Sequence, residues 1–207
     1  MDNDLSLGLK YYYGIDEYQS YQKAYELLLG CSEAGDCVAK YHVGTMLYYG
    51  YGVRKDKVKA IALITDSSNY GYHQAEYFVG SRHEDGRDGF AKDKKLAYEY
   101  YEKSAIKGNI YGCITMGDHY YYESKNNPDC LNLAIQYYRI GVDNGSSDCC
   151  IRLGDLHILG IGVQKDKTLA KQYYEKAIES NHSVASEVAR QRIKAISRLH
   201  RILEDDR

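Results

Sequence analysis

The sequence predicts an all-α fold, a right-handed α/α superhelical solenoid of about five helix-turn-helix repeats followed by a C-terminal capping helix. One irregular pattern of glycines, an aspartate and an alanine occurs at the same offsets in two segments that begin at Val43 and Leu153. The markers of that pattern also recur at a nearly constant spacing along the chain. A single proline, Pro128, fits a largely helical protein, because a proline inside a helix costs about 3 kcal/mol.

The repeat register is set by a glycine that directly follows an apolar residue. These anchor glycines are Gly8, Gly44, Gly80, Gly117 and Gly154, at nearly equal spacing. An alanine follows each anchor at a nearly constant offset, namely Ala24, Ala60, Ala97, Ala134 and Ala170. A closing residue follows each alanine at a constant offset, namely Gly35, Gly71, Gly108, Gly145 and Asn181. We therefore predict an array over residues 1–182 with repeats at about 1–36, 37–72, 73–109, 110–146 and 147–182.

The first helix of each repeat surrounds the anchor glycine. Residues five and one before the anchor and three after it share a helical face, as Ala39, Val43 and Leu47 do in the second repeat. A small residue and a glycine on this stripe let another helix approach closely. Gly50 and Gly52 then end the helix and turn the chain.

The second helix of each repeat begins after a residue whose side-chain oxygen is able to cap free backbone N–H groups. Its apolar stripe begins at the alanine of the repeat pattern, and a glycine in the left-handed conformation ends it; Asn181 replaces that glycine in the fifth repeat. The predicted capping residues are Ser20, Asp56, Asp93, Asp129 and Asp166.

Two repeats and the C-terminus depart from this pattern. The third repeat has a charged insertion at residues 83–89, and the fourth has residues 123–128 in place of its loop glycines. Residues 183–207 form the predicted capping helix, apolar on the side that faces the array and charged outside. Its apolar stripe comprises Val184, Val188, Ile193, Ile196, Leu199 and Leu203, and its basic residues are Arg190, Arg192, Lys194, Arg198 and Arg201.

These motifs resemble the Sel-one-like repeat, which is related to the tetratricopeptide repeat. The shared pattern is an apolar residue and glycine, then Gly-x-Gly-Val-x-Lys-Asp, an alanine, and Tyr-Tyr-x-Lys-Ala before the closing residue. It covers about residues 1–189, is most specific in the second and fifth repeats and is weak in the fourth loop. The resemblance implies a superhelix whose concave face, lined by the first helices, binds peptides or proteins as an adaptor or scaffold.

The candidate partner-binding residues lie at offsets −3, +1 and +4 from the anchors, away from the packed stripe. Rigid aromatic side chains beside a few acids suit a peptide with apolar and basic side chains. The alternative is that the tyrosines of this chain, 24 in number, fill contacts between helices. The residues are Tyr12, Tyr41, Thr45, Tyr48, Tyr77, Ser81, Glu84, Ile114, Asp118, Tyr121, Ile151, Asp155 and Ile158.

No pattern in the sequence indicates catalysis, a metal or a cofactor. The Gly-x-Gly loops lack the third glycine and the strand of a dinucleotide site. His83, Glu84, Asp85 and Asp88 lack the alternating oxygen ligands of a calcium loop, and we interpret them as a solvated loop. No histidine lies at a fixed offset from a nucleophile. We therefore predict a binding protein and not an enzyme.

The charge and the termini bear on partners and location. The formal net charge is −2, which favours neither nucleic acid nor an acidic membrane. Residues 1–5 resemble no signal peptide and the apolar runs are short, so we expect an intracellular protein without membrane spans, whose six cysteines are reduced. Two alternative functions remain: structural self-association, and binding of an acidic partner or nucleic acid by the basic C-terminal helix.

Overall fold

The computed structural model describes residues 2–15, 19–179 and 183–205, with the side chains of residues 2, 183 and 199–205 left out. The predicted helix stop at Asn181 therefore lies outside the described residues, as do the side chains of Leu199, Arg201 and Leu203. The chain divides into an N-terminal unit, residues 1–104, and a C-terminal unit, residues 105–207, with the division inside one helix.

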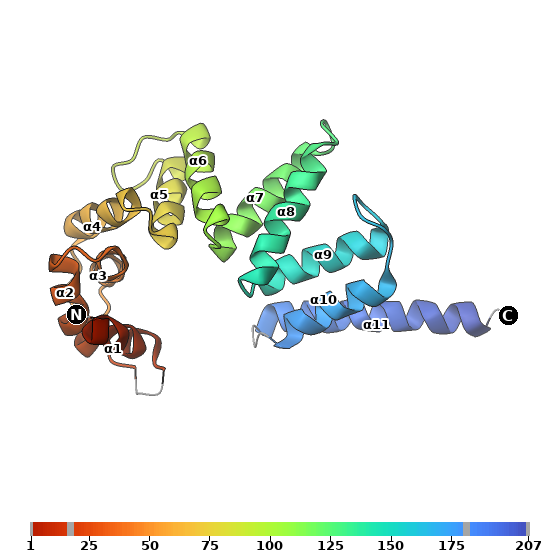
Figure 1. Cartoon of the computed structure of the whole chain (residues 1–207), viewed down its shortest axis with the longest axis horizontal. Helices are drawn as coiled ribbons and strands as arrows, with labels where there is room; N and C mark the ends of the chain where they lie inside the picture. The colour runs from red at the N-terminus through yellow and green to blue at the C-terminus, as the bar shows by residue number, and fades with distance from the viewer. Residues whose placement is uncertain (1, 16–18, 180–182, 206–207) are drawn as a thin grey trace. The chain divides into compact units, whose positions relative to one another are not determined.

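All regular structure in the described ranges is α-helical, which confirms the predicted all-α repeat fold (Figure 1). Most helices are 12 to 14 residues long, and the last one is longer. They are α1 (Asp2–Tyr13), α2 (Tyr21–Glu33), α3 (Cys37–Tyr49), α4 (Lys57–Asn69), α5 (His73–Asp85), α6 (Lys94–Ile106), α7 (Ile110–Glu123), α8 (Cys130–Asp143), α9 (Ser147–Leu159), α10 (Lys167–Glu179) and α11 (Ser183–Asp205).

In the N-terminal unit, each anchor glycine faces the second helix of its repeat with little room for a Cβ atom. A Cβ atom added to Gly44 would lie 2.6 Å from Ile64 Cγ1 and 3.1 Å from the carbonyl oxygen of Ala60, both on α4. The stripe beside this glycine, Ala39, Val43 and Leu47, is buried. The predicted packing face of the first helix is thus confirmed, and its glycine is required by space.

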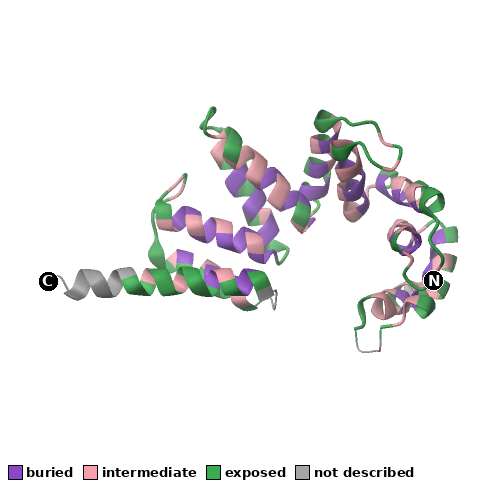
Figure 2. Ribbon diagram, turned by 180° about the vertical axis from the view of Figure 1, so that it is seen from behind, coloured by how far each residue is buried: buried purple, intermediate pink, exposed green. Residues whose placement is uncertain are grey.

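The C-terminal unit repeats this contact. Cβ atoms added to Gly117 on α7 and Gly154 on α9 would meet the rings of Tyr138 on α8 and Tyr174 on α10. Both rings are buried, and Figure 2 shows the buried residues as stripes along the packed faces of these helices. In this unit, the helix pairs α7–α8 and α9–α10 therefore each combine a glycine on one helix with a large aromatic residue on the other.

Four of the five predicted capping residues accept a backbone hydrogen bond at the start of their helix. The donors are the N–H groups of Lys23, Lys59, Leu96 and Leu169, at 2.9–3.4 Å from Ser20, Asp56, Asp93 and Asp166 respectively.

The prediction for Asp129 is wrong. Its backbone is helical, its side chain makes no capping bond, and its own N–H donates to Asn127 Oδ1 at 3.2 Å. Pro128 stands directly before Asp129, and a proline fits best in the first turn of a helix. The start of the turn is thereby moved toward Asn127, and the oxygen of Asn127 takes the capping role.

The charged segment of the third repeat differs from the predicted solvated loop. His83, Glu84 and Asp85 form the last turn of α5, and only the residues after them leave the helix. The side chain of Asp88 is 13% exposed and accepts a hydrogen bond from the Tyr48 hydroxyl at 2.7 Å. Burial opposes ionisation of Asp88, but this hydrogen bond and the charges of Lys57 and Arg82 keep its pKa below the usual value.

The packed face of α11 also differs in part from the prediction. Val184 is 68% exposed, whereas Ala185 and Ala189 are buried and Ile193 and Ile196 are partly buried. Small residues bring α11 close to its neighbours, and the Ser186 hydroxyl donates to the carbonyl of Ile178 on α10 at 3.2 Å. The packed stripe of α11 therefore begins at Ala185, one residue after the predicted Val184.

The glycines that follow the second helices have positive φ angles, as predicted, and Gly108 at +86° gives a direct test. Gly108→Val should lower the free energy of unfolding by about 2 kcal/mol, because a β-branched residue resists this conformation. A Cβ atom there would also lie 2.7 Å from Asn144 Cγ. Urea unfolding measures the loss; Gly35→Val, at φ +101° with open space around it, should lose less. An unchanged stability of Gly108→Val would contradict the helix boundary.

Candidate functional site

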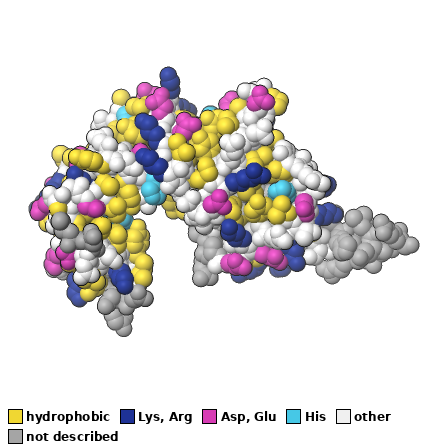
Figure 3. Space-filling view, viewed as in Figure 1, with side chains coloured by type: hydrophobic (Ala, Val, Ile, Leu, Met, Phe, Trp, Pro, Cys, Tyr) yellow, Lys and Arg dark blue, Asp and Glu magenta, His cyan; other side chains and the backbone are white. Residues whose placement is uncertain are grey.

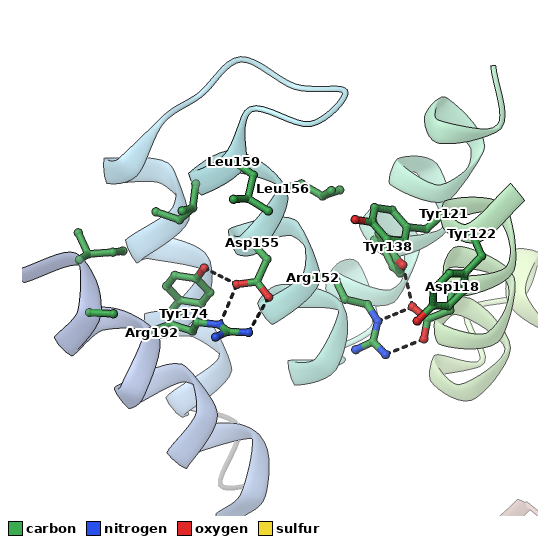
Figure 4. Close-up of a pocket in the computed structure, with 13 residues that line it drawn as sticks. Asp118, Tyr121, Tyr122, Tyr138, Arg152, Asp155, Leu156, Leu159, Tyr174 and Arg192 are labelled. Carbon is green, nitrogen blue, oxygen red and sulfur yellow. Dashed lines mark hydrogen bonds and ion pairs between the residues drawn. The ribbon is translucent and has the colours of Figure 1, made fainter. Parts of the chain in front are cut away.

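A cavity of about 490 Å³ lies within the C-terminal unit, and we call it the C-terminal cavity. Side chains from α7, α8, α9, α10 and α11 line it (Figure 4). The lining residues are Asp118, Tyr121, Tyr122, Tyr138, Arg152, Asp155, Leu156, Ile158, Leu159, Tyr174, Arg192, Ala195 and Ile196. Its volume is in the range of pockets that take a small molecule or a few side chains.

One side of the C-terminal cavity is built on Asp118 of α7. Arg152 of α9 reaches Asp118 with Nε 2.5 Å from Oδ1 and Nη2 2.6 Å from Oδ2, a two-point ion pair (Figure 4). The Tyr138 hydroxyl donates to Oδ1 at 2.7 Å. The hydrogen bonds to Asp118 raise the pKa of Arg152, and burial followed by the bond to Asp118 raises the pKa of Tyr138. Both groups keep their protons at any physiological pH.

The other side repeats the arrangement on Asp155 of α9. The Tyr174 hydroxyl donates to Asp155 Oδ1 at 2.8 Å, and Arg192 of α11 places Nε 2.9 Å from Oδ1 and Nη2 3.2 Å from Oδ2. Burial and the bond to Asp155 raise the pKa of Tyr174. In the fourth and fifth repeats, the carboxylate that follows the anchor glycine thus binds a tyrosine of its own second helix and an arginine of the helix after that.

Between these two ion pairs the wall of the C-terminal cavity is apolar. Leu156, Ile158, Tyr121 and Ile196 line it, and Tyr122 and Leu159 at its rim are 63% and 61% exposed. Figure 3 shows hydrophobic side chains beside acidic and basic ones on this unit. Because the two aspartates are neutralised by the two arginines, the cavity offers apolar surface and fixed hydrogen-bonding groups without net charge.

Six predicted partner-binding residues belong to the C-terminal unit. Asp118, Tyr121, Asp155 and Ile158 all line the C-terminal cavity, so the structure brings these four together. Ile114 and Ile151 are not among its lining residues, and Ile151 is buried.

The predicted residues of the second repeat contact side chains of their own unit. Thr45 is buried and donates to the His42 carbonyl at 2.8 Å, and the Tyr12 hydroxyl of the first repeat lies 3.4 Å from Thr45 Oγ1. The Tyr41 ring lies 5.3 Å from the Tyr72 ring. Tyr48 binds Asp88 and packs edge-on against a phenylalanine. Of these residues, Thr45 is only 5% exposed and offers a partner very little surface.

The predicted residues of the third repeat lie along α5. The Tyr77 ring is 5.1 Å from the Tyr101 ring of α6, and the Tyr101 hydroxyl donates to Glu84 Oε2 at 2.7 Å. The Ser81 hydroxyl donates to the carbonyl of Phe78. Glu84 and Tyr77 remain partly exposed.

The arginines and the second-helix tyrosines of the cavity were not predicted from the sequence. Arg152 contacts a carboxylate 34 residues earlier and Arg192 one 37 residues earlier. The tyrosines do have a sequence signal. Tyr101, Tyr138 and Tyr174 follow their anchor glycines at nearly the same offset, and so form a recurring polar position on the second helices.

In the described part of the chain, no group of three or more histidine, cysteine, aspartate or glutamate side chains is placed to hold a metal ion. None of the helices in that part has both the length and the hydropathy that crossing a membrane requires.

Comparison with known families and proteins agrees with the repeat pattern. The family model of the Sel1 repeat matches residues 5–29, 37–65, 73–109 and 147–182. The gap in these matches is the fourth repeat, where the resemblance is weak. The chain is 28% identical over 140 residues to the ERAD-associated E3 ubiquitin-protein ligase component HRD3B of Arabidopsis thaliana, which covers 62% of the chain and 23% of that protein.

A second relative is more similar in length. Cytochrome c oxidase assembly factor 7 of Xenopus tropicalis is 27% identical over 141 residues, covering 65% of the chain and 61% of that protein. Among solved structures, the Sel1 repeat protein from Oxalobacter formigenes superposes with a TM-score of 0.70 at 25% identity, over 89% of this chain and 74% of that one. The chain spans less than a quarter of the plant relative's length.

Proposed function

The chain belongs to the Sel1 repeat family, and we propose that it is a protein-binding adaptor or scaffold without catalytic activity. The observation that carries this proposal is the C-terminal cavity, where four side chains that were predicted to contact a partner lie together. The relatives named as a ubiquitin-ligase component and as an assembly factor support a role in protein assemblies. The partner and an intracellular location remain predictions.

The ligand that the cavity suits best is a peptide segment with a large apolar side chain. Its apolar wall and its exposed rim residues, Tyr122 and Leu159, provide area for such a side chain. The polar groups are already paired with each other, so a charged side chain would find no unpaired opposite charge there. Buried apolar contacts supply most of the energy in interfaces of this kind.

A displayed library of random peptides tests this function on the intact chain. We expect selection to enrich peptides with a large apolar residue, and the double variant Tyr122→Ala/Leu159→Ala to bind them at least tenfold more weakly. The reason is that the double variant removes two large apolar side chains on which the peptide would pack, and a tenfold loss corresponds to only about 1.4 kcal/mol. Both residues are exposed, so the variant should keep its fold and melting temperature.

A matched control removes the same kind of surface outside the cavity. Tyr111 of α7 and Val184 of α11 are 59% and 68% exposed and do not line the C-terminal cavity. Tyr111→Ala/Val184→Ala should bind the selected peptides like the original chain. Equal loss in both double variants would remove the cavity as the site, and failure to enrich any peptide would contradict peptide binding itself.

A further inference from the structure

One side-chain arrangement recurs in both units: a tyrosine hydroxyl that donates to a carboxylate. It links residues on different helices, or on a helix and a loop, at distances of 2.7–2.8 Å. Four such pairs are Tyr48 with Asp88, Tyr101 with Glu84, Tyr138 with Asp118, and Tyr174 with Asp155.

In three of these pairs the carboxylate also binds an arginine of the same chain. Arg82, Arg152 and Arg192 lie 3.3, 2.5 and 2.9 Å from Asp88, Asp118 and Asp155 respectively. In two of them the guanidinium carbon also lies near the centre of the donating tyrosine's ring, at 5.9 Å for Arg82 and 6.0 Å for Arg152. The tyrosine–carboxylate pair therefore works in this protein as a receptor for a guanidinium group.

The fourth pair, Glu84 with Tyr101, has no such arginine within the described residues. The arginines on either side of Glu84 in the sequence are engaged elsewhere, Arg82 with Asp88 and Arg87 with Asp85. Glu84 Oε2 accepts the Tyr101 hydroxyl, and the glutamate remains partly exposed.

We propose that Glu84, with Tyr101, binds an arginine side chain of a partner protein. A guanidinium pairs with a carboxylate through two parallel hydrogen bonds and stacks on aromatic rings, which a lysine ammonium does less well. The Tyr101 ring is itself held in place by the Tyr77 ring, whose centre lies 5.1 Å away. This site lies in the N-terminal unit, so the test of arginine binding is independent of the test of peptide binding at the C-terminal cavity.

The test titrates N-acetyl-arginine methylamide into the isotope-labelled chain and follows side-chain NMR signals. We expect saturable shifts at Glu84 and Tyr101, with a dissociation constant on the order of 10 mM for one ion pair. The isosteric neutral citrulline derivative should bind at least tenfold more weakly, and so should Glu84→Gln toward the arginine probe. Absence of shifts, equal binding of citrulline, or unchanged shifts in Glu84→Gln would each overturn the proposal.

A second variant tests the same reasoning in the opposite direction. Arg192→Gln removes the guanidinium from Asp155 but leaves Tyr174 as its hydrogen-bond donor. The arginine probe should then shift the signals of Asp155 and Tyr174, which it leaves unchanged in the original chain. If the vacated pair does not take up the probe, a tyrosine–carboxylate pair is insufficient to bind arginine and the proposal for Glu84 fails with it.

Discussion

Gly154→Ala should destabilise the C-terminal unit by about 3 kcal/mol, at the upper end of the usual cost of overpacking a core. The added methyl carbon would lie 2.5 Å from Tyr174 Cε1 and 2.9 Å from its Cζ. Tyr174 is 1% exposed, and its hydroxyl is held by Asp155. The ring therefore cannot move away without breaking that hydrogen bond or shifting α10. Urea unfolding followed by circular dichroism measures the change.

The chain contains a matched control for this substitution. Gly30 lies inside α2, is exposed, and would place a methyl group in open space. Gly30→Ala should stabilise the protein by up to about 1 kcal/mol, because alanine is the better helix former. A loss of stability in Gly154→Ala together with a gain in Gly30→Ala would show that packing, and not helix propensity, determines the effect of the added methyl group. Equal gains in stability would mean that α9 and α10 are farther apart than the structure has them.

The helices were predictable from the sequence because their signals are local. An anchor glycine, the alanine that follows it at a fixed offset and a closing glycine all act within one repeat, and each has one steric reason. The prediction for Asp129 was wrong because Pro128 changes where the helix starts, although the capping residue itself is of the right type. The start of α11 was predicted correctly, but the beginning of its packed stripe was assigned to Val184 instead of Ala185, because small alanines pack closely and are harder to recognise as an apolar stripe.

The candidate site was only partly predictable, because its contacts join different repeats. The carboxylates Asp118 and Asp155 were found from their offset on the first helix. Their arginines, Arg152 and Arg192, come from α9 and α11, and Arg192 belongs to a helix outside the repeat pattern. The sequence interpretation assigned Arg192 to an outer charged face, whereas the structure places it on the wall of the C-terminal cavity.

Two of the basic residues of α11 are paired with acidic side chains, which reduces the positive charge that this helix offers to a partner. Arg192 pairs with Asp155 and Arg190 with Glu187, the latter at 3.8 Å on the helix surface. Both pairs neutralise charge that binding to nucleic acid would use.

The second large effect is a loss of stability in acid that depends on His42 of α3. Its side chain is 2% exposed, its Nδ1 accepts or donates no hydrogen bond within the described residues, and the rings of Tyr12 and Tyr41 lie 4.8 and 5.2 Å away. Burial lowers the pKa of His42 to about 4, although the charge of Asp36 acts in the opposite direction. The folded chain therefore keeps this imidazole neutral.

The direction of this pH effect follows from comparing the protonation of His42 in the folded and the unfolded chain. An unfolded chain has a histidine pKa of about 6.5, so between pH 6.5 and 4 it takes up a proton that the folded chain does not. The free energy of unfolding of the N-terminal unit should therefore fall by about 3 kcal/mol over this range. Above pH 7 both states are neutral at His42, and the contribution to the pH dependence disappears.

Unfolding by urea at pH 7, 6, 5 and 4 should separate this effect from the titration of carboxylates. His42→Leu keeps a side chain of similar volume without a titratable group, so its stability should fall less steeply in acid, with the difference reaching about 3 kcal/mol at pH 4. Carboxylates change both proteins alike and cancel. Parallel profiles would show that His42 is protonated in the folded state, and an NMR titration of the imidazole in the unmodified chain would decide the same point independently of the variant's fold.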